Sequence, residues 1–243
     1  MRFIWPKLQR MPLAIKRQVW VWILCYQQHQ RMAFFLISVL VSVFLIAFVD
    51  RNVALWVSTE VPADVRGFFR FITDWAKGTI WYLLCGLWLL VSTLGRLRSE
   101  AAAKVLYWRH QCRRACFFLL SLLSSGIVLL LAKFVIGRFR PRYLLRDDTY
   151  GFLPFNMDFA ALSYPSGHTQ VIFCVATVAT VLWPVLRVPA FGAAVILGLS
   201  RVMVSAHYPA DVVMGAYVGI VVTLFVKDRM ERSGKPLAPV GAE

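Results

Sequence analysis

Long apolar runs dominate this sequence and restrict the folds that are open to it. Six stretches carry almost no charge and approach or reach the length of about 20 residues that a helix needs to cross a bilayer. The mean hydropathy of +0.65 and the hydrophobic fraction of 59% are far above the values of soluble domains. Lipid offers the backbone no hydrogen-bond partners, so each run is expected to be helical. The expected spans are residues 33–49, 79–95, 115–136, about 169–184, 188–204 and 210–226.

The spacing of these runs predicts an all-α protein, a polytopic membrane bundle with about six transmembrane helices in one domain. Residues 1–32 form a cytoplasmic arm with a candidate interfacial helix, residues 33–227 form the bundle, and residues 228–243 form a cytoplasmic tail. We find no removable signal peptide pattern before the first run, so that run is expected to direct insertion.

The net charge of +15 is placed mainly between the apolar runs. This placement favours topology and attraction to lipid head groups over nucleic-acid binding. Three basic regions are expected on the cytoplasmic side, which an even number of spans allows: the N-terminal arm, the connection around residues 96–114, and the tail from residue 227. The connection after the third span breaks the pattern, because it must lie on the outer side and still holds Arg138, Arg140, Arg142 and Arg146.

Alternating helix direction brings the chemically active residues to that same outer face. The third span ends near Lys133 and Arg140, and the fourth begins after Ser166. Arg201 lies at the end of the fifth span, and His207 precedes the sixth. Ionisable residues at membrane depth are costly unless they are paired or functional. The converging residues are Lys133, Arg140, Ser166, Gly167, His168, Arg201, His207 and Asp211.

These residue types suit a phosphate group. Lysine and arginine donors match phosphate oxygens, and Gly167 lets a helix N-terminus approach an anion closely. His207 and Asp211 are four residues apart, so the carboxylate can hold one imidazole nitrogen protonated and leave the other as a nucleophile. His168, from a different helix, is free to protonate a leaving oxygen and later to activate water.

Three elements of this region, K-F-V-I-G-R-F-R-P, P-S-G-H and S-R-V-M-V-S-A-H-Y-P-A-D, resemble the signature motifs of the type 2 phosphatidic acid phosphatase (PAP2) superfamily. The motifs extend from Lys133 to Asp211, and the six-helix plan extends the resemblance over most of the chain. The resemblance implies a phosphoenzyme at His207, an acid at His168, and Asp211 as the residue that orients His207. It also implies phosphate binding by Lys133, Arg140, Ser166, Gly167 and Arg201, with no metal and no other cofactor.

The sequence therefore predicts a metal-independent membrane phosphatase, a phosphoric ester or diphosphate hydrolase that acts through a phosphohistidine. Its expected partners are the lipid bilayer and a phospholipid or polyprenyl phosphate substrate, with no nucleic acid; the oligomeric state is not predicted. Substrates of the family include undecaprenyl diphosphate, phosphatidylglycerol phosphate, phosphatidate and the 1-phosphate of lipid A. The expected location is a bacterial inner membrane, with both termini cytoplasmic and the site facing the periplasm.

Two other functions remain open. A lipid phosphotransferase would use the same site with another acceptor in place of water. An anion transporter would use the buried cations for conduction, although the charges here cluster at helix ends and not at mid-membrane breaks. Residues that flank the motifs have weaker interpretations: Arg138 and Arg142 either steer anionic head groups or are solvated at the surface, and residues 71–78, with Asp74 and Lys77, are candidates for the substrate entrance.

Overall fold

The computed structural model describes residues 30–158, 161–234 and 237. The chain divides into two units, residues 1–40 and residues 41–243. The first unit contributes the start of helix α3 (Gln30–Phe48), and the arm and interfacial helix expected within residues 1–29 lie outside the described residues. The residues that the motifs single out all belong to the second unit.

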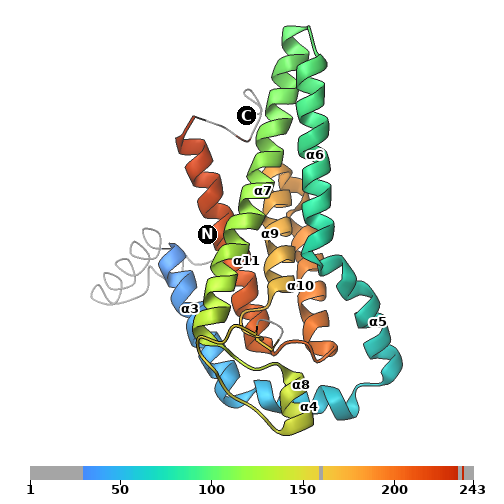
Figure 1. Ribbon diagram of the computed structural model, residues 1–243, viewed down its shortest axis with the longest axis vertical. Coiled ribbons are helices and arrows are strands. Elements are labelled where there is room, and N and C mark those ends of the chain that lie inside the picture. The colour runs from blue at the N-terminus through green and yellow to red at the C-terminus, as the bar shows by residue number, and fades with distance from the viewer. Residues whose placement is uncertain (1–29, 159–160, 235–236, 238–243) are drawn as a thin grey trace, which may run out of the picture. The chain divides into compact units, whose positions relative to one another are not determined.

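The second unit is built from helices (Figure 1). In the part of the chain that is described, the extended structure is limited to two isolated bridges, Arg138 with Phe152 and Phe139 with Leu162. The expectation of an all-α polytopic fold is therefore confirmed. After α3 the elements are α4 (Asp50–Glu60), α5 (Ala63–Thr73), the 3₁₀ turn η1 (Asp74–Ala76), α6 (Gly78–Arg98), α7 (Ala102–Ile136), α8 (Pro141–Asp147), α9 (Gly167–Leu182), the 3₁₀ turn η2 (Pro184–Leu186), α10 (Arg187–Met203) and α11 (Pro209–Arg232).

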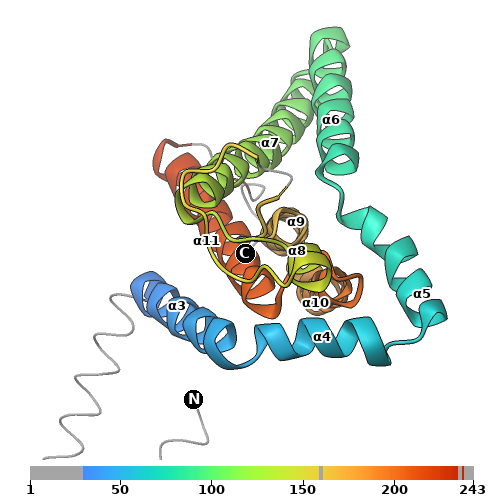
Figure 2. The same ribbon diagram turned by 60° about the horizontal axis from the view of Figure 1, so that its bottom comes forward.

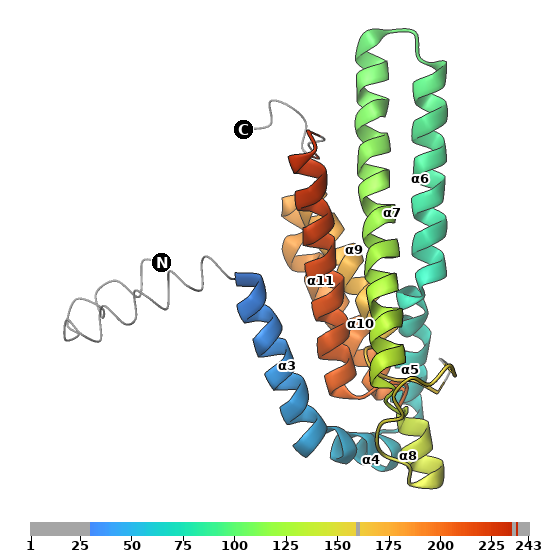
Figure 3. The ribbon, with the colours of Figure 1, turned by 60° about the vertical axis from the view of Figure 1, so that its left-hand side comes forward.

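Five described segments are long and apolar enough to cross a membrane, and α9 is a shorter apolar helix of 16 residues. Together they match the six predicted spans. Helix α9 packs against α7, α10 and α11, and α6 packs along α7 as an antiparallel hairpin (Figure 3). Most apolar side chains on the outer faces of α6 and α7 are exposed, as a lipid-facing surface requires, whereas α9 is buried along most of its length.

Helices α9 and α11 approach each other closely because α11 presents two glycines, four residues apart, to α9. A β-carbon at Gly215 would lie 2.5 Å from the carbonyl oxygen of Ser166, and one at Gly219 would lie 2.4 Å from that of Gln170. Small residues at this spacing let helix backbones pack together in membranes. The contact fixes the start of α9 against the start of α11, where the predicted site residues lie.

The connection from Gly137 to Ser166 folds over the ends of α9, α10 and α11 (Figure 2). Helix α7 is followed by Gly137, whose φ of +63° is the left-handed conformation that glycine adopts without strain. A β-carbon there would lie 1.8 Å from the carbonyl oxygen of Leu153, so the returning chain leaves room only for glycine. This turn directs Arg138 and Arg140 back toward the bundle.

Candidate active site

The predicted residues gather at one end of the bundle, as the alternation of helix directions requires. Lys133 lies in the last turn of α7 and Arg201 in the last turn of α10. Gly167 begins α9, His207 precedes α11, and Asp211 lies in the first turn of α11. Helix α8 and the connection that contains it cover this end (Figure 2).

His207 and Asp211 form a buried pair, and Ser163 contacts both of them. The His207 Nδ1 atom lies 3.4 Å from Asp211 Oδ2 and 3.2 Å from Ser163 Oγ. The Ser163 hydroxyl donates in turn to Asp211 Oδ2. His207 is 3% exposed and Asp211 is fully buried. With Nδ1 directed at these two oxygens, the Nε2 atom is the ring nitrogen left for chemistry.

Burial lowers the pKa of His207 to about 3, and the hydrogen bond and charge of Asp211 oppose this shift only in part. The imidazole is therefore neutral at physiological pH, which is the form in which a ring nitrogen carries a free electron pair. A neutral, oriented imidazole beside a carboxylate has the arrangement of an activated nucleophile.

Arg138 is the largest correction to the sequence interpretation, which left it as a head-group contact or a solvated surface residue. Its side chain is 1% exposed, and its Nη1 atom donates to Asp50 Oδ2 at 2.7 Å and to Asp211 Oδ1 at 2.9 Å. The guanidinium also donates from Nη2 to the Tyr150 hydroxyl at 2.9 Å and stacks on the Tyr208 ring at 4.1 Å. A steering role at the surface is excluded by this burial.

Asp50 completes this charged cluster from the start of α4. Its Oδ1 atom accepts a hydrogen bond from the backbone amide of Ala210 at 3.1 Å, so the aspartate contacts both Arg138 and the first turn of α11. Burial raises the pKa of Asp50, and the neighbouring Arg138 opposes the shift. One arginine thus lies between two buried carboxylates, one of which also contacts His207.

Lys133 and Arg140 approach the same short segment from two sides. The Lys133 Nζ atom donates to the carbonyl oxygens of Leu162 at 2.9 Å and Ser163 at 3.1 Å. The Arg140 Nε atom donates to the Leu162 carbonyl at 3.2 Å. Among the described residues, one ammonium hydrogen of Lys133 and both terminal nitrogens of Arg140 have no further acceptor, so they remain for a ligand. Burial lowers the pKa of Arg140, and the nearby charge of Arg142 lowers it further.

The start of α9 presents hydrogen-bond donors at a helix N-terminus. Ser166 is fully buried and caps the helix: its Oγ atom accepts from the Thr169 hydroxyl at 2.9 Å and the Thr169 amide at 3.4 Å. Its own hydroxyl hydrogen has no acceptor in the part of the chain that is described. The amides of Gly167 and His168 belong to the first helical turn, where no intrahelical acceptor exists, and the helix dipole favours negative charge there.

Arg201 is held by Thr73, a residue that the sequence analysis named only as part of a candidate entrance. The Arg201 Nη1 atom donates to Thr73 Oγ1 at 2.8 Å, and the arginine is 8% exposed. Its Nε atom is buried without a hydrogen-bond partner among the described residues. A buried, unpaired donor is costly, and an anion at the site would satisfy it. Near the same residue, Asp74 and Lys77 form an exposed ion pair of 2.9 Å.

Ser163 and Asp50 are site neighbours that sequence reasoning missed, and the contact of Thr73 with Arg201 was not predicted either. Asp50 offered a signal, because it is an acidic residue directly after an apolar run, and such residues need a partner. Thr73 and Ser163 offered none, since a lone hydroxyl residue in a connection is common and its partners come from distant segments.

The donors gathered at this end are arginine and lysine groups, a hydroxyl and helix amides around a neutral imidazole. They suit a phosphoryl group, and a bundle of membrane spans places them beside lipid. The fold and the site thus define a membrane phosphatase. Residues 114–235 match the model of the PAP2 superfamily, and the chain belongs to that superfamily. It is a multi-pass membrane lipid phosphatase and thus a phosphoric ester hydrolase.

Two curated relatives are similar over most of their length. The lipid A 1-phosphatase of Rhizobium johnstonii is 29% identical over 192 residues, which cover 76% of each chain. The lipid A 1-phosphatase of Rhizobium etli is 31% identical over 169 residues, 67% of this chain and 70% of the relative.

Two crystal structures share the fold. One is a PAP2-type phosphatidylglycerolphosphate phosphatase from Bacillus subtilis, with a TM-score of 0.55 and 18% identity over 83% of this chain and 96% of that one. The other is Aquifex aeolicus LpxE, with a TM-score of 0.52 and 21% identity over 73% of this chain and 94% of that one.

Proposed function

We propose that this enzyme removes the 1-phosphate of lipid A, through a phosphohistidine at His207 and without a metal ion. The substrate is supported by the two rhizobial lipid A 1-phosphatases, which match 76% and 67% of this chain. The mechanism is supported by one observation above the others: a neutral, buried His207 whose Nδ1 atom faces Asp211 and Ser163.

In the first step the His207 Nε2 electron pair attacks phosphorus, and the bond from phosphorus to the leaving oxygen breaks. His168 gives a proton to that oxygen, so the dephosphorylated lipid leaves as a neutral hydroxyl. Positive charge develops on the His207 ring as the new bond forms. Asp211 stabilises that charge through Nδ1, while Arg138 and the Tyr208 amide hold the carboxylate in place.

In the second step water attacks the phosphoryl group, and His168 accepts the water proton. The bond from phosphorus to Nε2 breaks, its electrons return to the ring, and inorganic phosphate leaves. The negative charge on the three phosphoryl oxygens is stabilised through both steps by Lys133, Arg140, Arg201, the Ser166 hydroxyl and the Gly167 amide. Such preorganised donors supply most of the rate enhancement in phosphoryl transfer.

We further infer that the site faces the periplasm from a bacterial inner membrane. The opposite end of the second unit carries the basic connection between α6 and α7 and the basic end of α11, with Arg96, Arg98, Lys104, Arg229 and Arg232. Clusters of this kind lie on the cytoplasmic side of membrane proteins. A site at the other end would meet lipids whose head groups lie in the outer leaflet.

A phosphate-release panel tests both parts of the proposal. The purified full chain is given lipid A 1-phosphate, undecaprenyl diphosphate, phosphatidylglycerol phosphate or phosphatidate in mixed micelles, with water as the only acceptor. We expect release from lipid A to be fastest. His207→Ala should lower release at least about 10⁴-fold, because the covalent route is lost.

Faster release from another lipid would overturn the substrate, and substantial release by His207→Ala would overturn the nucleophile. Release by water alone also excludes an obligatory phosphotransferase. His110→Ala is the matched control, since His110 lies in α7 near the opposite end, and its activity should stay within about twofold of the parent chain.

A further inference from the structure

A second hollow lies far from the site, near the opposite ends of α6, α7 and α11. It is an open groove of about 880 Å³. Arg113, one of its lining residues, is 20 positions before Lys133 in α7, which corresponds to about 30 Å along the helix axis. That distance is about the apolar thickness of a bilayer, so the groove belongs to the leaflet on the other side.

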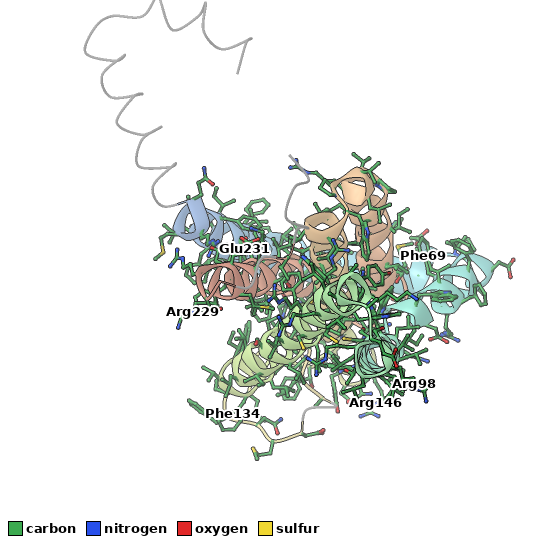
Figure 4. The ribbon with its side chains drawn as sticks, turned by 90° about the horizontal axis from the view of Figure 1, so that it is seen from above. Phe69, Arg98, Phe134, Arg146, Arg229 and Glu231 are labelled. Carbon is green, nitrogen blue, oxygen red and sulfur yellow. The ribbon has the colours of Figure 1, made fainter. Side chains whose placement is uncertain are left out.

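Four arginines line the end of this groove that lies farthest from the site. Arg96 comes from α6, Arg109 and Arg113 from α7, and Arg229 from α11. No described residue forms an ion pair with any of the four, and the described lining contains no acidic residue. Figure 4 looks onto this end, and its labels mark Arg229 on α11 and Arg98 on α6. Topology explains positive charge at this end, but not its convergence on a hollow.

The rest of the groove is mainly apolar, with Ser124 and Ser233 as its hydroxyl residues, and runs along the helices. Its walls extend on α7 from Cys116 to Val128, which corresponds to about 18 Å of helix. On α11 they include Val221, Val222 and Phe225. A single leaflet has an apolar thickness of about 15 Å, so the walls extend across one leaflet and slightly beyond it. A groove with arginines at one end and apolar walls of this length is complementary to a phospholipid with an anionic head group.

We propose that this groove binds one anionic phospholipid of the leaflet opposite the site, with its phosphate among Arg96, Arg109, Arg113 and Arg229 and an acyl chain between α7 and α11. The site is separate from the catalytic centre and does not depend on the proposed substrate. Charge selects the head group, because arginine forks bind phosphate, and the apolar walls accept any acyl chain.

Native mass spectrometry of the full chain in detergent tests the proposal. The probes are dioleoyl phosphatidylglycerol and dioleoyl phosphatidylethanolamine, which differ only in the head group. We expect retention of the anionic lipid at a ratio near one, and weaker retention of the zwitterionic lipid. The double variant Arg109→Gln/Arg113→Gln should bind phosphatidylglycerol about tenfold or more weakly.

Matched variants separate the groove from general surface charge. Arg98→Gln/Arg232→Gln removes the same charge from the same end without touching the groove lining, and its affinity should stay within about twofold. Ser124→Phe fills the groove and should reduce binding of both lipids, whereas Leu123→Phe, on an exposed face of α7, should not.

Three results would overturn the proposal: equal retention of the two lipids, equal loss in the two double variants, or no lipid retained by the full chain. If no lipid is retained, the measured mass distinguishes two alternatives. A dimer mass means that a second copy covers the groove, and the mass of a lipid-free monomer means that the chain's own residues cover it. Because the readout is binding, the outcome stands apart from the phosphate-release panel.

Discussion

Helix α10 carries an arginine at each end, and the two are in opposite situations. Arg187 begins the helix and is exposed, whereas Arg201 lies in the last turn, is 8% exposed and donates to Thr73. The same contrast separates the two ends of the second unit. At the site end, Arg138, Asp50 and Asp211 are almost completely buried and paired; at the other end, Arg98 and Arg109 are exposed.

The difference shows what each kind of charge does. Exposed basic residues interact with water and head groups and can be exchanged at little cost. A buried charge is tolerated only when its partner is present. Such a pair adds little net stability, but it fixes the positions of the side chains that form it. The charges at the site end are therefore expected to be individually necessary for stability or catalysis, and those at the other end to be individually dispensable for both.

The largest effect is expected for Arg138→Ala. The change leaves Asp50 and Asp211 buried together without a cation, and breaking such a cluster costs about 3–5 kcal/mol. Chemical unfolding in detergent should show this loss of stability, together with a loss of phosphate release, because Asp211 no longer keeps its place beside His207. Arg98→Ala, at the exposed end, should change the free energy of unfolding by no more than about 0.5 kcal/mol.

Asp50→Asn provides a second test if Arg138→Ala does not accumulate as a folded protein. The asparagine keeps the size of the side chain and leaves Arg138 paired with Asp211, so a smaller loss of stability is expected. Equal unfolding curves for Arg138→Ala and Arg98→Ala would contradict the contrast between the two ends.

The next largest effect is a loss of catalytic activity, and it is tested by replacing the arginine at each end of α10. Arg201→Ala removes a buried donor whose Nε atom has no partner among the described residues, and kcat/KM should fall about 10²–10³-fold, the loss typical of one oxyanion donor. Arg187→Ala serves as the control and should retain nearly full activity. A loss below tenfold at Arg201 would contradict its assignment as a phosphate ligand.

The sequence was sufficient for the spans and for the set of residues at one end, because apolar length and alternating direction depend only on local pattern. The elements it missed are amphipathic or short: α4, α5 and α8 contain no long apolar run. Arg138 was misinterpreted for a related reason. Its partners are 88 and 73 residues away, and no spacing rule connects an arginine in a connection to aspartates in two other segments.

The smallest expected effect is a pH dependence that also distinguishes the site end. The pKa of His207 is about 3 in the folded chain, below the value of about 6.5 in the unfolded chain. A lowered histidine pKa stabilises the fold fully above pH 6.5, and this contribution is lost progressively as the pH falls toward 3. At pH 5 the loss is about 2 kcal/mol, from about 1.5 pKa units at about 1.4 kcal/mol each.

Between pH 7 and pH 5, the free energy of unfolding should therefore fall more for the parent chain than for His207→Asn, which has no group to protonate at this position. The absolute stability of the variant does not matter, because only the change with pH is compared. Equal changes in the two proteins would mean that His207 is accessible to protons in the folded state. This result would contradict the assignment of His207 as a buried, neutral nucleophile, on which the mechanism depends.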